Sequence, residues 1–210
     1  MRTISLLSLL SFCCLPLLSQ PQYLMPRFES GTVYYKEGSV VKAYMNYNLL
    51  TGRMMMNEGN RRKSVTISEE VEYLSISGTQ FIPLDGELGQ ILMDGDRAVL
   101  ALKVRATVKT NPGTKAVSKD KLDKQLESNG PMPEGVSMAV DSSFWLVRQK
   151  EYTKRFHLAE SKVEPANRRG FVKMYGKFSK EIDDFVLEHE TNFKLEADLR
   201  KLMQYCESLE

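Results

Sequence analysis

The sequence is poor in cysteine, which limits how its fold can be stabilised. Of its 3 cysteines, Cys13 and Cys14 fall in the apolar N-terminal run and Cys206 lies close to the C-terminus. If the N-terminal run is removed after export, a single thiol remains, and a disulfide within the mature chain is excluded. The hydrophobic core must then hold the fold together, and we expect Cys206 to be a small buried apolar residue.

An excess of one charge and a second long apolar run are also lacking. The 29 basic and 27 acidic residues give a formal net charge of +2, which offers no electrostatic basis for binding nucleic acid. Beyond residue 19, no apolar stretch approaches the ~20 residues that cross a membrane. We therefore expect neither a nucleic-acid partner nor a transmembrane segment in the mature chain.

Sequence motifs for catalysis or metal binding are missing as well. The two histidines, His157 and His189, fall in no zinc-binding pattern, and the chain has no nucleophile-elbow motif. Residues 54–56 are all methionine, but neighbours on a strand point to opposite faces, so filling of the core is the better explanation. Asp183-Asp184 lies in no calcium-loop pattern and is typical of a solvated acidic face. We predict no cofactor, no metal site and no catalytic residue.

The N-terminus has the features of a secretory signal. A short basic start, Met1-Arg2, precedes an apolar run over residues 4–18, and Ser19 is a suitable small residue for cleavage. A run of this length is typical of a signal peptide. Phe12-Cys13 departs from the small-residue pattern that precedes a lipidated cysteine, which disfavours a lipid anchor. We predict a signal peptide over residues 1–19 and an exported chain, periplasmic or extracellular.

Residues 20–160 have the pattern of short strands separated by turns. Residues 32–35 and 41–47 predict a hairpin, and residues 98–108 alternate most clearly with the period of a strand. Turn signals about every 8–12 residues favour an antiparallel meander, either a curled sheet or a small barrel. A polar segment over about residues 111–134, with Pro and Gly at its edges, predicts a mobile insertion. Further strands are expected at 53–57, 64–67, 71–76, 79–84, 90–93, 144–149 and 152–158.

From residue 161 to residue 210 the period becomes helical. We expect a short helix at 166–175, a second at 180–190 with Ser179 as its N-cap, and a third at 194–208. The third helix should bury one stripe of side chains: Leu195, Leu199, Leu202, Met203 and Cys206. The predicted fold class is α+β, an antiparallel β-meander followed by two or three C-terminal helices packed on it.

Three segments resemble one protein family. They are residues 28–38 (FESGTVYYKEG), residues 43–52 (AYMNYNLLTG) and residues 171–177 (FVKMYGK). This pattern is similar to that of a family of uncharacterised exported proteins of Bacteroidetes bacteria, which carry G-x-V-x-Y-x-x-G followed by N-Y-N. The resemblance covers most of the mature chain outside residues 111–143. It implies a Gram-negative envelope or its exterior, and it implies no mechanism.

Three residues are candidate ligand contacts. Tyr34 and Tyr44, if exposed side by side on neighbouring strands, would form an aromatic platform for a sugar or a peptide. Asn46 either shapes a turn by bonding nearby backbone, which we favour, or contacts a ligand. We predict a non-enzymatic envelope or secreted module that binds an envelope protein, peptide or glycan, or that is a structural part of a complex. The alternative is an exported hydrolase whose site is assembled from scattered residues.

Overall fold

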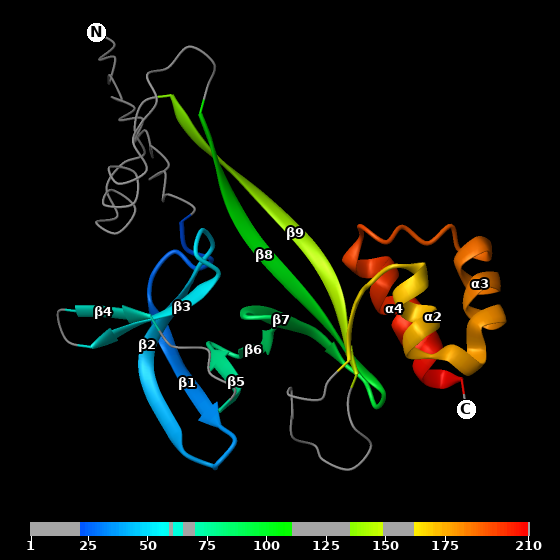
Figure 1. Ribbon diagram of the computed structural model, residues 1–210, viewed down its shortest axis with the longest axis horizontal. Helices are drawn as coiled ribbons and strands as arrows, with labels where there is room; N and C mark the ends of the chain where they lie inside the picture. Colours follow the sequence, from blue (N-terminus) through cyan, green and yellow to red (C-terminus); the bar gives the residue numbers. More distant parts are fainter. Residues whose placement is uncertain (1–21, 59–60, 65–69, 111–134, 149–161, 210) are drawn as a thin grey trace, which may run out of the picture.

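The computed structural model describes residues 22–58, 61–64, 70–110, 135–148 and 162–209. Several predicted features lie outside these residues: the signal peptide at 1–19, the insertion at 111–134, and the strand at 152–158 with His157. The described part consists of a large sheet with a group of helices at one end (Figure 1). The predicted α+β class, with the sheet first and the helices after it, is confirmed.

The strands form one antiparallel sheet of ten strands in the order β10-β9-β8-β7-β6-β5-β1-β2-β3-β4. The sheet is curled. It is not a closed barrel, because β10 and β4 are the two ends of this order and do not pair with each other. The strands are β1 (Glu29–Tyr35), β2 (Val40–Asn48), β3 (Arg53–Glu58), β4 (Arg61–Ser64), β5 (Val71–Ile76), β6 (Thr79–Leu84), β7 (Glu87–Asp94), β8 (Ala98–Thr110), β9 (Val136–Arg148) and β10 (Val163–Pro165).

The meander is interrupted once. Strands β1–β4 follow one another, as do β5–β10, but β5 pairs with β1 instead of β4. The predicted β1–β2 hairpin is present and turns at Gly38, whose φ of 94° favours glycine. Strand β4 lies at Arg61–Ser64, earlier than the strand expected at 64–67, and this leaves a strand of adjacent basic residues at the sheet edge.

Three helices and a 3-10 turn follow the sheet: α2 (Arg168–Met174), η2 (Gly176–Phe178), α3 (Ser179–Glu188) and α4 (Glu196–Ser208). The side chain of Asn167 caps α2 by accepting a hydrogen bond from Gly170 N at 2.9 Å. The prediction that Ser179 caps α3 is wrong, because η2 runs directly into α3 and Ser179 is already helical. Leu195 precedes α4 in an extended conformation and is 52 % exposed, so it lies outside the buried stripe.

Buried side chains form three clusters. The first cluster joins one face of β8 and β9 to α2, α3 and α4. Cys206 is buried in this cluster, as predicted. A second cluster lies on the other face of β8 and β9 and includes Val99 and Val147. The third fills the curl between β1, β2, β3 and β5, where Met54 packs as a core residue. Strands β8 and β9 are therefore buried on both faces where they meet the helices.

Candidate functional site

The β8–β9 hairpin is longer than the sheet that supports it. Its residues pair continuously from Ala98 opposite Arg148 to Thr110 opposite Val136. Residues 99–102 also pair with β7, and residues 145–147 also pair with β10. Beyond those positions, residues 103–110 and 136–143 pair only with each other among the described strands, and we call them the arm. Figure 1 shows the arm extending away from the helices.

The arm has one polar and one apolar face. Thr107, Lys109, Ser137 and Asp141 lie on the polar face and are exposed. The opposite face carries small and apolar side chains, because successive residues of a strand point to opposite sides: Val104, Ala106, Val108, Val136, Met138 and Val140. At its base this face joins the core, where Ala106 is buried, but Val140 is 50 % exposed. Apolar surface therefore continues from the core onto the exposed arm.

The two edges of the arm differ. On β8, Ala106 N donates to Leu49 O at 2.8 Å, so the turn between β2 and β3 occupies this edge. On β9, Phe144 O accepts from Ala166 N at 2.8 Å, so the backbone groups of Phe144 face away from β8. Backbone polar groups alternate along a strand, which directs those of Met138 and Val140 to the same outer edge. No described strand pairs with that edge.

The outer edge of β9 also lacks the usual protection of an edge strand. Exposed edges are commonly blocked by charged side chains, proline or bulges. The end strand β4 contains Arg61-Arg62-Lys63, which fits such protection. In contrast, residues 136–143 contain one charged residue, Asp141, with no proline, and pair with β8 without a bulge. The β9 edge of the arm is thus chemically suited to pairing with another strand.

A group of polar side chains fixes β8 where the arm begins. Arg105 donates to Glu87 Oε2 at 2.9 Å and to the backbone oxygen of Leu50 at 3.2 Å. The hydrogen bond from Arg105 holds the pKa of Glu87 below its usual value. Lys103 Nζ lies 4.7 Å from the ring centroid of Trp145, a cation–π contact. The contacts of Arg105 with Glu87 of β7 and with Leu50 attach the start of the arm to the rest of the sheet.

The hydroxyl of Tyr47 lies close to this polar group and is itself unsatisfied. It is buried and has no hydrogen-bond partner among the described residues. Burial, together with the nearby negative charge of Glu87, raises the pKa of Tyr47 to about 12. Tyr47 therefore stays neutral well above the usual pKa of a phenol.

Tyr34 and Tyr44 do not form the platform considered above. Tyr34 lies opposite Val40 of β2, whereas Tyr44 lies opposite Ser30 of β1, so the two rings are separated along the hairpin. Tyr34 instead stacks on Tyr73 of β5, with ring centroids 4.2 Å apart, and Tyr44 is 63 % exposed. The sequence could not reveal this arrangement, because β5 reaches β1 only through the tertiary fold.

Asn46 is buried and holds the chain that precedes β1. It is only 1 % exposed. Its amide donates to Met25 O at 2.8 Å and to Arg27 O at 2.9 Å, and its oxygen accepts from Met25 N at 3.1 Å. These partners lie 19 and 21 positions away in sequence, so Asn46 holds the preceding segment and does not shape the local turn that we favoured from the sequence.

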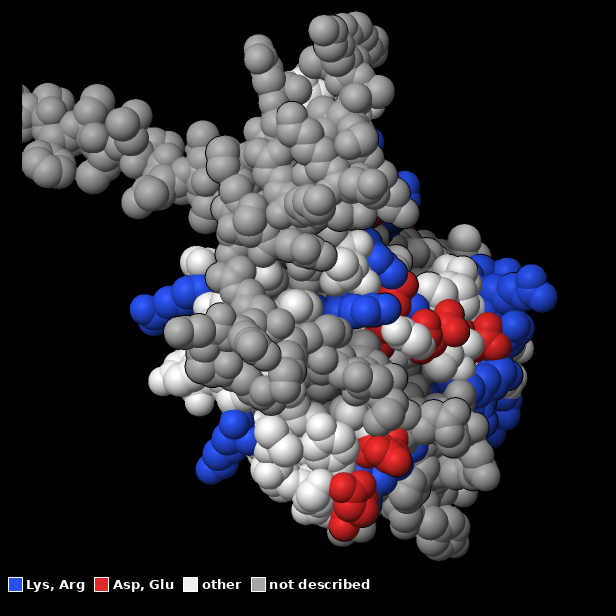
Figure 2. Space-filling model, turned by 60° about the vertical axis from the view of Figure 1, so that its left-hand side comes forward, with Lys and Arg blue, Asp and Glu red and all other residues white. Residues whose placement is uncertain are grey.

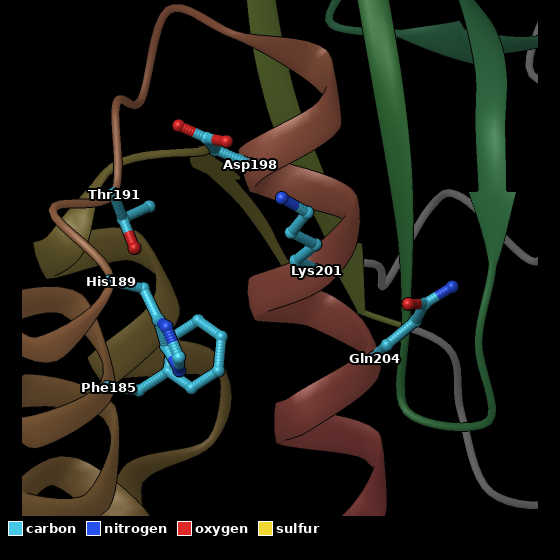
Figure 3. A pocket seen from close by; sticks show the side chains of 6 residues that line it. All are labelled: Phe185, His189, Thr191, Asp198, Lys201 and Gln204. Atoms are coloured by element: carbon cyan, nitrogen blue, oxygen red, sulfur yellow. The ribbon is translucent and has the colours of Figure 1, made fainter.

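A hollow of about 350 Å³ lies between α3 and α4. It is lined by Phe185, His189, Thr191, Asp198, Lys201 and Gln204. Figure 3 shows the side chains of the first three on the α3 side and those of the last three on α4. The helix expected over residues 180–190 contains His189, but the sequence gives no sign of the hollow, because the hollow needs two helices and the loop between them.

The acidic residues of α3 form no metal site. Asp183 pairs with Arg168 of α2 through two contacts of 2.7 Å. Within the described ranges, no group of three or more metal-ligating side chains converges. Figure 2 shows basic and acidic side chains together on one face of the molecule.

Comparison of the chain with models of known protein families, with curated proteins and with solved structures finds no match. Among the described residues, no helix has the length and apolar character needed to cross a membrane. The arm and the α3–α4 hollow are the two candidate sites of the described residues.

Proposed function

We propose that this protein is an exported, non-enzymatic binding module of a Gram-negative envelope or its exterior, and that its arm binds a partner protein by strand addition. The outer edge of β9 carries this proposal, since Met138 and Val140 direct backbone groups outward without a described strand partner. Export is supported by the apolar leader, and the envelope by the family resemblance of residues 28–52.

The expected partner is an extended segment with alternating side chains. In strand addition, backbone hydrogen bonds supply affinity and side chains on the two faces supply specificity. Apolar side chains of the added strand would lie beside Val140 and Met138, on the apolar face of the arm. Within residues 136–143, the one charged residue is Asp141, which is exposed and favours a basic residue on the other face of the added strand.

The proposal is tested with synthetic peptides and fluorescence anisotropy. The probe is a short peptide in which Val alternates with Lys and Thr, compared with one that has Glu in place of Lys and with a scrambled one. We expect the alternating basic peptide to bind with a Kd of about 100 µM or tighter. The acidic peptide should bind more weakly, and the scrambled peptide should not bind.

The chain offers a matched pair of proline variants. Val108 and Met138 face each other across the arm, and their backbone N–H groups point to opposite edges. Met138→Pro removes a donor from the β9 edge and should weaken peptide binding at least about tenfold. Val108→Pro removes the corresponding donor from the β8 edge and should leave binding unchanged. Failure of the wild type to bind, or equal binding by both variants, would refute the proposal.

A further inference from the structure

We propose that the α3–α4 hollow binds a free α-amino acid with an aromatic or large apolar side chain. This site is separate from the arm, since its lining comes from α3, α4 and the loop between them (Figure 3). Its volume of about 350 Å³ lies within the range of small-ligand sites. The proposal rests on one acidic group, one basic group and one aromatic wall that face the same space.

The two charges belong to α4 and are not paired with each other. Asp198 and Lys201 are three positions apart, so they lie on the same side of the helix. No ion pair joins them, whereas Glu196 and Arg200 of the same helix pair at 2.7 Å. Asp198 Oδ2 accepts a hydrogen bond from Asn192 N at 3.0 Å, and Oδ1 has no hydrogen bond among the described residues.

An α-amino acid carries one charge of each sign, complementary to those of Lys201 and Asp198. Its ammonium group would donate to Oδ1 of Asp198, and its carboxylate would accept from the ammonium of Lys201. Both groups are attached to one carbon, so a single small molecule reaches both side chains. The hydroxyl of Thr191 and the amide of Gln204 lie on the same hollow and offer further hydrogen-bonding groups.

The aromatic wall of the hollow is the ring of Phe185, and two neighbouring rings hold it in place. The ring of Phe185 is half-buried and stacks on Tyr205 of α4, with centroids 4.5 Å apart. The imidazole of His189 lies against the same ring, 4.1 Å away and tilted by 56°. A fixed aromatic surface favours the ring or the branched side chain of a ligand over a bare glycine.

The test is an NMR shift titration of the full chain with L-phenylalanine. Phenethylamine lacks the carboxylate, 3-phenylpropionate lacks the ammonium group, and glycine lacks the side chain. We expect L-phenylalanine to bind with a Kd of about 1 mM or tighter, shifting signals of α3 and α4, and the other three to bind at least about tenfold more weakly.

Three variants distinguish specific binding in the hollow from a non-specific effect of surface charge. Lys201→Gln and Asp198→Asn each remove one charge, and the asparagine keeps an oxygen for Asn192 N. Each should weaken binding about tenfold or more. Lys180→Gln removes a charge at the other end of α3 and should change nothing. Absence of binding, or equal affinity in Lys201→Gln and the wild type, would overturn the assignment.

The outcome is independent of the arm. Lys201→Gln and Asp198→Asn should retain full peptide binding at the β9 edge, and Met138→Pro should retain full binding of L-phenylalanine. For each variant, an unfolding curve that matches that of the wild type would show that the fold is intact.

Discussion

The two halves of the β8–β9 hairpin share one pairing pattern and have opposite surroundings. Near the helices, Leu100 and Leu146 are fully buried on one face, and Val99 and Val147 are buried on the other. In the arm, the same two strands expose Val140 and most of their polar residues. Continuous pairing runs through both halves.

The two halves show that backbone pairing can continue along a hairpin where the burial that stabilises the fold ends. An isolated two-stranded hairpin is marginally stable in water, because it buries little apolar surface. Burial supplies about 25 cal/mol per Å² of apolar surface, so the half beneath the helices anchors the arm. The arm is held by this buried half of the hairpin and by the packing of Val104, Ala106 and Met138 against the core cluster of β1, β2, β3 and β5.

The strongest test of this comparison is a pair of truncations on the same strand. Leu146→Ala should lower the free energy of unfolding by about 2–5 kcal/mol, since it leaves a cavity under the helices. Val140→Ala in the arm should change it by less than about 0.5 kcal/mol, because the side chain is half exposed. Urea unfolding followed by circular dichroism measures both. Similar losses in the two variants would show that the side chain of Val140 contributes to the core as much as that of Leu146 does.

A smaller effect is expected from the contact that closes the helical end. Glu207 of α4 accepts hydrogen bonds from Tyr175 Oη at 2.6 Å, Asp96 N at 3.1 Å and Arg97 N at 3.2 Å. Glu207→Ala leaves the buried Tyr175 hydroxyl unpaired and should lower the free energy of unfolding by about 1–3 kcal/mol.

The control for this variant is on the same helix. Glu196→Ala breaks only the exposed pair with Arg200 and should cost about 0.5 kcal/mol or less. Thermal unfolding would compare the two. Equal costs would mean that Glu207 is an ordinary surface residue, and that the helices are held by their apolar contacts alone.

The smallest effect concerns the boundary between the two halves, where Glu87 pairs with Arg105. The pKa of Glu87 is lowered on folding, so the pair stabilises the fold above the unfolded pKa of about 4.5 and this contribution is lost as the pH falls through the folded pKa. Since both side chains are partly exposed, its size is about 0.5 kcal/mol. Glu87→Gln should show a correspondingly smaller loss of stability between neutral and acidic pH in urea titrations. An unchanged pH profile would contradict this role.

Several elements could be predicted from the sequence because their signals are local. Alternation at 98–108 correctly indicated β8, and the spacing of Leu199, Leu202, Met203 and Cys206 correctly indicated the buried face of α4. The first half of β9, from Val136 to Ser143, was not predicted, although Val136, Met138 and Val140 alternate there with smaller and polar residues. Pairing with β8 makes that segment a strand, and pairing depends on a neighbour that is distant in sequence.

Neither candidate site could be predicted, for a related reason. Asp198 and Lys201 are ordinary charged residues in the sequence, and Phe185 and His189 form a usual helical pattern. They become a site only when α3 packs against α4. Likewise, Met138 and Val140 mark an open edge only because no described strand continues the sheet beside them.

The sequence by itself determined most of the segments that become strands and helices, since periodicity and turn residues act over a few neighbouring positions. Only the tertiary structure decided that β5 lies beside β1, that Asn46 is buried, and that no described strand pairs with the outer edge of β9 in the arm. These outcomes depend on burial summed over distant parts of the chain, and no local pattern contains that sum.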